Sequence, residues 1–211
     1  MANLDPEGNR LYEKAGDLHP YHWEALARRD PAEAARAAGA SWDGKRFALP
    51  FLGALVRVEP GARAVAFGAD ANREPGYQRA LVAVAYLAGA VDAPPKGEWV
   101  ALRQLPGGDA FFRGPHSPAT PRLERAFGRR PEALADAAAR LGGRSVAAGD
   151  AAAELDALPK IPLRFVLWAG TDEFPPAATV LTDARAHLHL PLDVLWALTN
   201  VAIAEVVRGA A

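Results

Sequence analysis

Short apolar runs in the last third of the chain alternate with turn residues in a pattern that predicts a group of β-strands. Three such runs, each bounded by Gly, Pro or Asp, lie at about residues 151–157, 161–168 and 177–182. Pro159 and Pro162 flank the start of the second run. Because proline cannot donate a ladder hydrogen bond, we expect this strand either to lie near an edge of its sheet or to begin its pairing late.

Other segments have the hydrophobic spacing of helices. Apolar residues recur at helical intervals near the end of the chain, which predicts a helix over about residues 192–208. Residues 76–88, opened by Pro75, are apolar nearly all round and predict a buried central helix. Asp30-Pro31-Ala32-Glu33 has the capping pattern of a helix start, and Gly39 lies where that helix should end. The other predicted helices lie within about residues 8–38, 121–127 and 131–141.

The order of these elements indicates the fold class. A meander of two or three short antiparallel strands is expected between residues 45 and 67, and a further strand at about 98–102. Residues 105–121 are dense in Gly and Pro and predict a long loop, a feature that is often functional or mobile. Because regular β-α-β alternation is absent, we expect a single α+β domain over residues 1–211, with a mainly antiparallel sheet packed with helices.

Composition and charge exclude several classes of protein. The chain of 211 residues has a formal net charge of −1, so no excess of positive charge favours nucleic acid or a membrane surface as a partner. It has no cysteine, which excludes disulfides, thiolate metal sites, iron–sulfur clusters and thiol nucleophiles. The first residues lack a signal-peptide pattern, and no apolar run approaches the roughly 20 residues of a membrane span. We therefore expect a cytoplasmic protein.

The histidines supply one candidate metal site. In an extended segment, His187 and His189 point to the same face, where two imidazoles can bind one metal ion. The alternative is a partly exposed strand end before the helix that Pro191 opens, since two ligands without a located third fall short of a metal-binding set. His19 and His22, at a predicted helix start, are interpreted as surface residues. Phosphate-binding loops, nucleophile elbows and zinc-protease motifs are absent from the sequence.

Asp172 and Glu173 are the main candidates for ligand-binding carboxylates. They follow an apolar strand and precede Phe174-Pro175-Pro176, so a rigid turn can present a carboxylate into a cleft. A polar hairpin turn explains the same pattern. Asp183 and His116, which lies alone in the long loop, are further ligand-binding candidates. An antiparallel hairpin would separate Asp172 from Asp183 by about 17–20 Å, so the candidates can belong to two sites.

Two other patterns have a functional and a structural interpretation. Arg122, Arg125 and Arg129 recur at helical spacing and form a basic stripe, which can meet a phosphate or carboxylate or can simply face solvent. The tryptophans of apolar elements are expected in the core, namely Trp99, Trp168 and Trp196.

Short blocks in order along most of the chain resemble a known family. They include Leu49-Pro50-Phe51-Leu52-Gly53, Gly97-Glu98-Trp99-Val100, Leu158-Pro159-Lys160-Ile161-Pro162-Leu163 and Asp172-Glu173-Phe174-Pro175. Over about residues 20–207 the chain is similar to the family catalogued as domain of unknown function 3786, a single domain of bacteria and archaea. The resemblance implies a single-domain fold and singles out the Asp172 block. Some relatives join this domain to a cysteine-rich iron–sulfur segment, which a cysteine-free chain lacks.

These observations favour a small-molecule or cofactor-binding module. The first alternative is an enzyme that uses the carboxylates of Asp172 and Glu173 with a histidine, with or without a metal ion. The second is an interaction subunit without a small ligand. Absence of nucleophile and nucleotide motifs favours binding over catalysis. The sequence identifies no cofactor, ligand or oligomeric state.

Overall fold

One of the N-terminal helices begins and ends at the capping residues that the sequence predicts. The computed structural model describes residues 15–68 and 76–210, so the predicted helix before residue 15 and the role of Pro75 lie outside the described residues. A 3-10 turn (Ala15–Asp17) precedes α1 (Pro20–Ala27) and α2 (Pro31–Ala38). The Asp30 carboxylate accepts a hydrogen bond from the N–H of Glu33 at 2.9 Å, and Gly39 ends α2 in the left-handed conformation.

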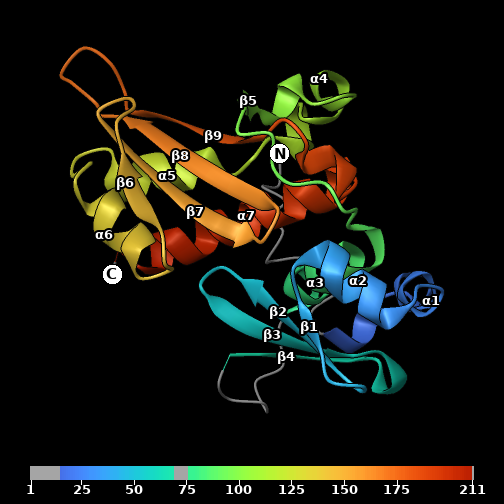
Figure 1. The fold of residues 1–211 in the computed structure, drawn as a ribbon. Coiled ribbons are helices and arrows are strands. Elements are labelled where there is room, and N and C mark those ends of the chain that lie inside the picture. The colour runs from blue at the N-terminus through green and yellow to red at the C-terminus, as the bar shows by residue number, and fades with distance from the viewer. Residues whose placement is uncertain (1–14, 69–75, 211) are drawn as a thin grey trace.

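The predicted meander forms the first of two antiparallel sheets, here called the N-terminal sheet (Figure 1). Its strands pair in sequence order and are β1 (Ser41–Trp42), β2 (Phe47–Phe51), β3 (Ala54–Glu59) and β4 (Ala64–Phe67). A 3-10 turn (Pro60–Ala62) joins the last two strands. Alternate side chains of β2 and β3 are buried, as expected of a sheet with one covered face: Phe47, Leu49, Phe51, Val56 and Val58.

The second sheet, here called the C-terminal sheet, has the strand order β5-β9-β8-β7-β6 and is antiparallel throughout. Its strands are β5 (Trp99–Ala101), β6 (Arg144–Val146), β7 (Ala151–Leu158), β8 (Ile161–Trp168) and β9 (Ala177–Asp183). Three helices, α5 (Thr120–Phe127), α6 (Ala133–Ala139) and α7 (Leu192–Arg208), pack on one face of this sheet (Figure 1). The two antiparallel sheets and their helices confirm the α+β prediction.

β8 lies in the middle of the C-terminal sheet, so the first expectation, an edge strand, is wrong. The second is confirmed on one side, because the pairing of β8 with β9 begins only at Leu163. Pro162 is paired with Asp156, next to an irregularity in the β7–β8 ladder between Asp156 and Leu158. The ladder is already interrupted there, so the missing N–H of proline is tolerated in a central strand. Trp168, the last residue of β8, is 45% exposed, so the prediction that it lies in the core is wrong.

The segment predicted as a long loop contains two short helical elements. α4 (Gly108–Phe111) and a 3-10 turn (Gly114–His116) lie within residues 105–121, after another 3-10 turn (Leu102–Gln104). Two hydrogen bonds join the segment to α7: Trp196 Nε1 donates to the Ser117 carbonyl at 3.3 Å, and the N–H of Ala119 donates to Asn200 Oδ1 at 2.9 Å. Structure in this segment therefore depends on contacts with α7 that Gly and Pro content does not reveal.

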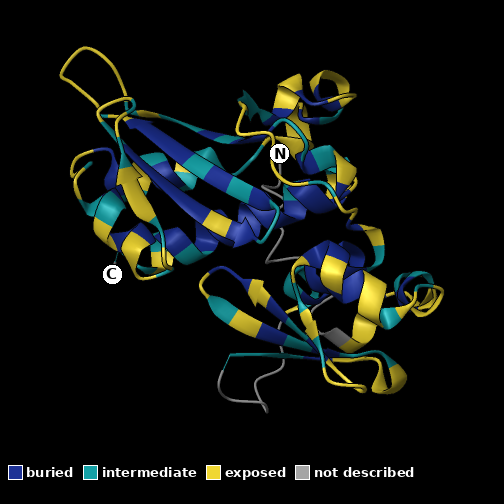
Figure 2. Cartoon of the chain, viewed as in Figure 1, coloured by how far each residue is buried: buried dark blue, intermediate teal, exposed yellow. Residues whose placement is uncertain are grey.

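Buried residues of the two sheets belong to one continuous hydrophobic core (Figure 2). The central helix α3 (Tyr77–Gly89) packs against α1 and α2 on one side and against α7 on the other, which confirms its predicted burial. The N–H of Leu52 also donates to the Ala157 carbonyl at 3.1 Å, which joins the β2–β3 turn to β7. Among the described helices, none combines the length and the apolar character needed to cross a membrane.

Candidate functional site

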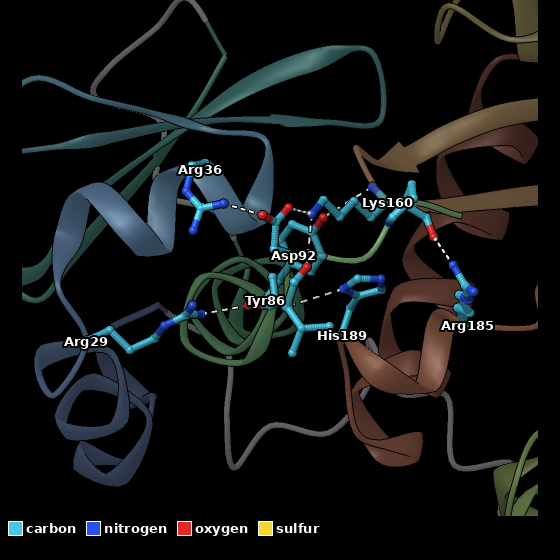
Figure 3. Close-up of polar contacts among 10 residues, drawn as sticks. Arg29, Arg36, Tyr86, Asp92, Lys160, Arg185 and His189 are labelled. Carbon is cyan, nitrogen blue, oxygen red and sulfur yellow. Dashed lines mark hydrogen bonds and ion pairs between the residues drawn. The ribbon is translucent and has the colours of Figure 1, made fainter. Parts of the chain in front are cut away.

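A group of polar side chains lies where α2 and α3 meet the C-terminal sheet (Figure 3). Its members are Tyr86, Asp92, Lys160 and His189, here called the inter-sheet cluster. Tyr86 is on α3 and Asp92 follows that helix, whereas Lys160 occupies the turn between β7 and β8. His189 follows a 3-10 turn (Ala186–Leu188) that links β9 to α7. The cluster therefore exists only when both halves of the chain are folded together.

Lys160 connects the β7–β8 turn to the C-terminal end of α3. Its Nζ donates to the Val91 carbonyl at 2.9 Å and lies 3.4 Å from Asp92 Oδ1, and its backbone N–H donates to the Tyr86 hydroxyl oxygen at 3.2 Å. Arg36 of α2 forms an ion pair with the same Asp92. Because the C-terminal end of a helix carries partial negative charge, a cation there stabilises the helix. Lys160 thus has a structural role.

Arg29 supports the same helix end from the other side. Its Nη1 donates to the Leu87 carbonyl at 3.0 Å and to the Ala90 carbonyl at 2.9 Å. Tyr86, one turn earlier, is fully buried, and this burial raises the pKa of its hydroxyl above the ordinary value. The hydroxyl therefore stays neutral at physiological pH. One lone pair of its oxygen accepts the hydrogen bond from the backbone N–H of Lys160.

His189, the histidine of the cluster, is almost fully buried, with 1% of its surface exposed. Burial is the main reason why its pKa falls from 6.5 to about 4; the Lys160 charge lowers it further, and Asp183 opposes the change. The imidazole is therefore neutral at pH 7. Its Nδ1 accepts a hydrogen bond from the N–H of Val91 at 3.4 Å, so the single ring proton resides on Nε2.

Two buried imidazole nitrogens in this region have no hydrogen-bond partner among residues 15–68 and 76–210. They are Nε2 of His189 and Nδ1 of His187. A buried donor without an acceptor costs about 1–3 kcal/mol, so most native proteins pair such groups. The N–H of His189 Nε2 can be satisfied by an oxygen that comes from outside the chain, such as that of a carbonyl or carboxylate group.

Asp183, a predicted ligand-binding residue, instead has its carboxylate engaged within the chain. It is 2% exposed and accepts hydrogen bonds from the N–H groups of Lys96, Gly97 and Arg185 at 2.7–2.9 Å. These bonds fix the segment before β5 against the end of β9. Asp183 thus acts on the inter-sheet cluster in two ways. Its charge opposes the fall in the pKa of His189, and its hydrogen bond to Arg185 holds the chain that leads from β9 to His189.

The extended geometry expected for His187 and His189 is wrong. The two residues lie in and directly after a 3-10 turn, where about three residues per turn place positions i and i+2 roughly 120° apart. Their rings are therefore not on one face, as a strand would have placed them. Within the described parts of the chain, no group of three His, Asp, Glu or Cys residues is arranged to hold a metal ion.

The structure separates Asp172 and Glu173 from the inter-sheet cluster. Both are exposed in the loop between β8 and β9, at the end of β9 opposite to Asp183. A strand of seven residues spans about 20 Å, so these carboxylates do not share a site with His187 or His189. This arrangement agrees with the two-site geometry expected from an antiparallel hairpin.

His116 does not join either group of candidate residues. It is exposed, its ring stacks on that of Phe111 with centroids 4.5 Å apart, and it meets the Trp196 ring edge-on at 5.9 Å. These contacts attach the predicted long loop to the start of α7. The imidazole therefore has a packing role on the surface of the protein.

Neither Tyr86 nor Lys160 is predicted as a functional residue by the sequence analysis, although both belong to the inter-sheet cluster. Tyr86 belongs to an apolar helix whose pattern predicts a core position, and this prediction is correct for the ring. Lys160 had a usable signal: it is one of few lysines in an arginine-rich chain and occupies a short turn between two buried strands. Lys160 also lies in a block that carries the family resemblance.

Comparison with known proteins identifies the family of the chain. A family model described as "Domain of unknown function (DUF3786)" matches residues 30–205, which is most of the sequence. The chain belongs to the DUF3786 family. No curated protein and no solved structure gives a significant match. The match spans both sheets, so the inter-sheet cluster lies inside the region that defines this DUF3786 domain.

Proposed function

We propose that this DUF3786 domain is a small-molecule-binding module whose ligand contacts the inter-sheet cluster. The observation that carries the proposal is the buried Nε2–H of His189, which has no acceptor among the described residues. A ligand oxygen in contact with this N–H would replace an unfavourable buried donor by a hydrogen bond. The ligand is therefore expected to carry a carbonyl, carboxylate or similar oxygen.

A metal ion is a less favourable occupant of the same position. Metal binding by His189 would use the lone pair of Nε2, whereas the hydrogen bond from Val91 to Nδ1 places the proton on Nε2. Metal-bound histidines ordinarily donate from their second nitrogen to an oxygen, the opposite of the arrangement found here. The same cluster offers no activated nucleophile, so binding is favoured over catalysis. The cytoplasmic location and the absence of a nucleic-acid partner stay predictions from the sequence.

Native mass spectrometry and a thermal-shift screen of small carboxylic acids and carbonyl compounds test the proposal. We expect either a mass above that of the chain in the purified protein, or a compound that raises the melting temperature. His189→Phe removes the N–H and keeps an aromatic ring of similar size. The unliganded variant should match the stability of the wild type within about 1 kcal/mol, because one unpaired buried donor is lost while the N–H of Val91 loses its acceptor.

His116→Phe is the matched control, since it replaces an exposed imidazole that lies outside the inter-sheet cluster. This variant should keep the ligand or the thermal shift that His189→Phe loses. Equal responses of both variants, or a wild type that carries nothing and responds to no compound, would show that His189 is only a core residue. Metal analysis accompanies the screen, and a tightly bound metal that depends on His189 would contradict the oxygen ligand.

A further inference from the structure

Two exposed aromatic side chains lie at the tip of the C-terminal sheet, in and beside the β8–β9 loop (residues 169–176). Phe174 is 68% exposed and Trp168 is 45% exposed, which places both among the most exposed large hydrophobic residues of the described chain. Large aromatic side chains gain the most free energy when they are buried, and groups of them on a surface mark sites of protein contact. This loop protrudes beyond the end of the sheet in Figure 1.

The loop is held in one shape by its own hydrogen bonds. The Thr171 hydroxyl oxygen accepts from the N–H groups of Glu173 and Phe174 at 3.3 and 3.1 Å, and the N–H of Thr171 donates to the Phe174 carbonyl at 2.8 Å. At the base, the N–H of Gly170 donates to the Gly128 carbonyl at 3.1 Å. A surface that is already ordered loses less conformational entropy when it binds, so this loop is suited to contact a partner.

Exposed charged residues of both signs belong to this loop and to the segment that is hydrogen-bonded to its base. Asp172 and Glu173 are exposed, and so are Arg129 and Arg130, which directly follow Gly128. Within the described part of the chain, none of these four side chains forms an ion pair. A surface with adjacent acidic and basic groups is complementary to itself, because a twofold axis brings the acidic part of each copy to the basic part of the other.

We propose that the β8–β9 loop is a self-association surface through which two copies of the chain pair about a twofold axis. Phe174 packs against the second copy, and the carboxylates of Asp172 and Glu173 face the arginines after α5 of that copy. A second copy is the chosen occupant because both halves of the charge complementarity are present on this one surface. The proposal is independent of ligand binding, since the loop lies at the end of β9 remote from the inter-sheet cluster.

Sedimentation velocity of the full chain over a wide range of concentrations tests this proposal. We expect a species of about twice the chain mass. Its dissociation constant should rise as salt is added, because exposed charge pairs are screened. Phe174→Ser should weaken association at least about tenfold, as expected of an aromatic contact at the centre of an interface. Leu55→Ser, at another exposed apolar residue near the start of β3, is the control and should leave association unchanged.

A charge exchange distinguishes pairing with a second copy from pairing with another protein. Glu173→Arg alone should weaken the dimer, and Arg129→Glu added to it should restore association, since the two charges are then reversed together. Circular dichroism should show unchanged folding, because the substituted side chains are exposed. A wild type that stays monomeric at every concentration would overturn the proposal, as would a dimer that Phe174→Ser leaves intact. A monomer that binds a different protein through Phe174 would also overturn it.

Discussion

His189 and Asp183 are both almost fully buried, yet only one of them has its hydrogen bonds completed within the described chain. The carboxylate of Asp183 accepts three backbone N–H groups, two from residues before β5 and one from a residue after β9. His189 uses one nitrogen and leaves the other without a partner among the described residues. At the residue scale, this difference separates a side chain whose hydrogen bonds hold the structure from one that keeps a buried polar group without a partner among the described residues.

Asp183→Asn should destabilise the fold by about 2–3 kcal/mol. The charged acceptor is lost, and the amide NH₂ takes the place of one carboxylate oxygen, where it points a donor at a backbone N–H. Urea unfolding at pH 7 measures the change in the free energy of unfolding. Asp172→Asn is the control, since this exposed side chain should change stability by less than about 0.5 kcal/mol. A loss of similar size in both variants would show that Asp183 is not an internal anchor.

At the scale of elements, the β2–β3 turn determines how closely the two sheets approach. Gly53 in this turn has φ of +74°, and a Cβ added there would lie 2.5 Å from the Leu141 carbonyl oxygen, at the end of the α6 region. The N–H of Leu52 next to it donates to Ala157 of β7. Glycine is therefore required at this position both by the backbone conformation and by the close approach of the Leu141 backbone.

Gly53→Ala and Gly44→Ala form a matched pair that separates these two effects. Both glycines have positive φ, but a Cβ at Gly44 would meet no atom within 4 Å. Both variants should lose stability from backbone strain, and Gly53→Ala should lose about 1–3 kcal/mol more because a side chain is forced against backbone. Thermal or urea unfolding measures the difference. Equal losses would show that the β2–β3 turn can move away from α6 without cost.

At the scale of the whole molecule, the described residues form two sheets but one continuous core. Residues of the N-terminal sheet, α3, α7 and the C-terminal sheet contribute to the same buried cluster, and the Arg79–Glu205 ion pair joins α3 to α7. The fully buried Tyr86 on α3 is bonded to the β7–β8 turn, so neither half retains its buried surface without the other. Sheets that share a core are expected to unfold together.

Calorimetry should therefore show one unfolding transition whose calorimetric and van't Hoff enthalpies agree, because exposing either sheet exposes α3 and α7 as well. Unfolding curves from far-UV circular dichroism and from tryptophan fluorescence should coincide. Two separated transitions, or a proteolytic fragment that keeps one sheet folded, would instead show that the halves are independent domains.

The sequence by itself determined most elements of this protein and their ends. Helix starts such as Asp30-Pro31, the end at Gly39 and the helix over residues 192–208 follow from capping groups and from periodicity, which act over a few neighbouring residues. The strands after residue 150 were predicted for the same reason. Local interactions of this kind are present in the sequence as written, so their result can be read from it.

Only the tertiary structure decided which elements became neighbours and hence where the candidate site lies. Val91 and His189 are 98 positions apart in the chain, and Tyr86 and Lys160 are 74 apart, yet each pair is joined by a hydrogen bond. Sheet order likewise placed β8 at the centre despite Pro162, left Trp168 exposed, and separated Asp172 from His189 by the length of β9. Such contacts depend on packing of the whole chain, which no local pattern specifies.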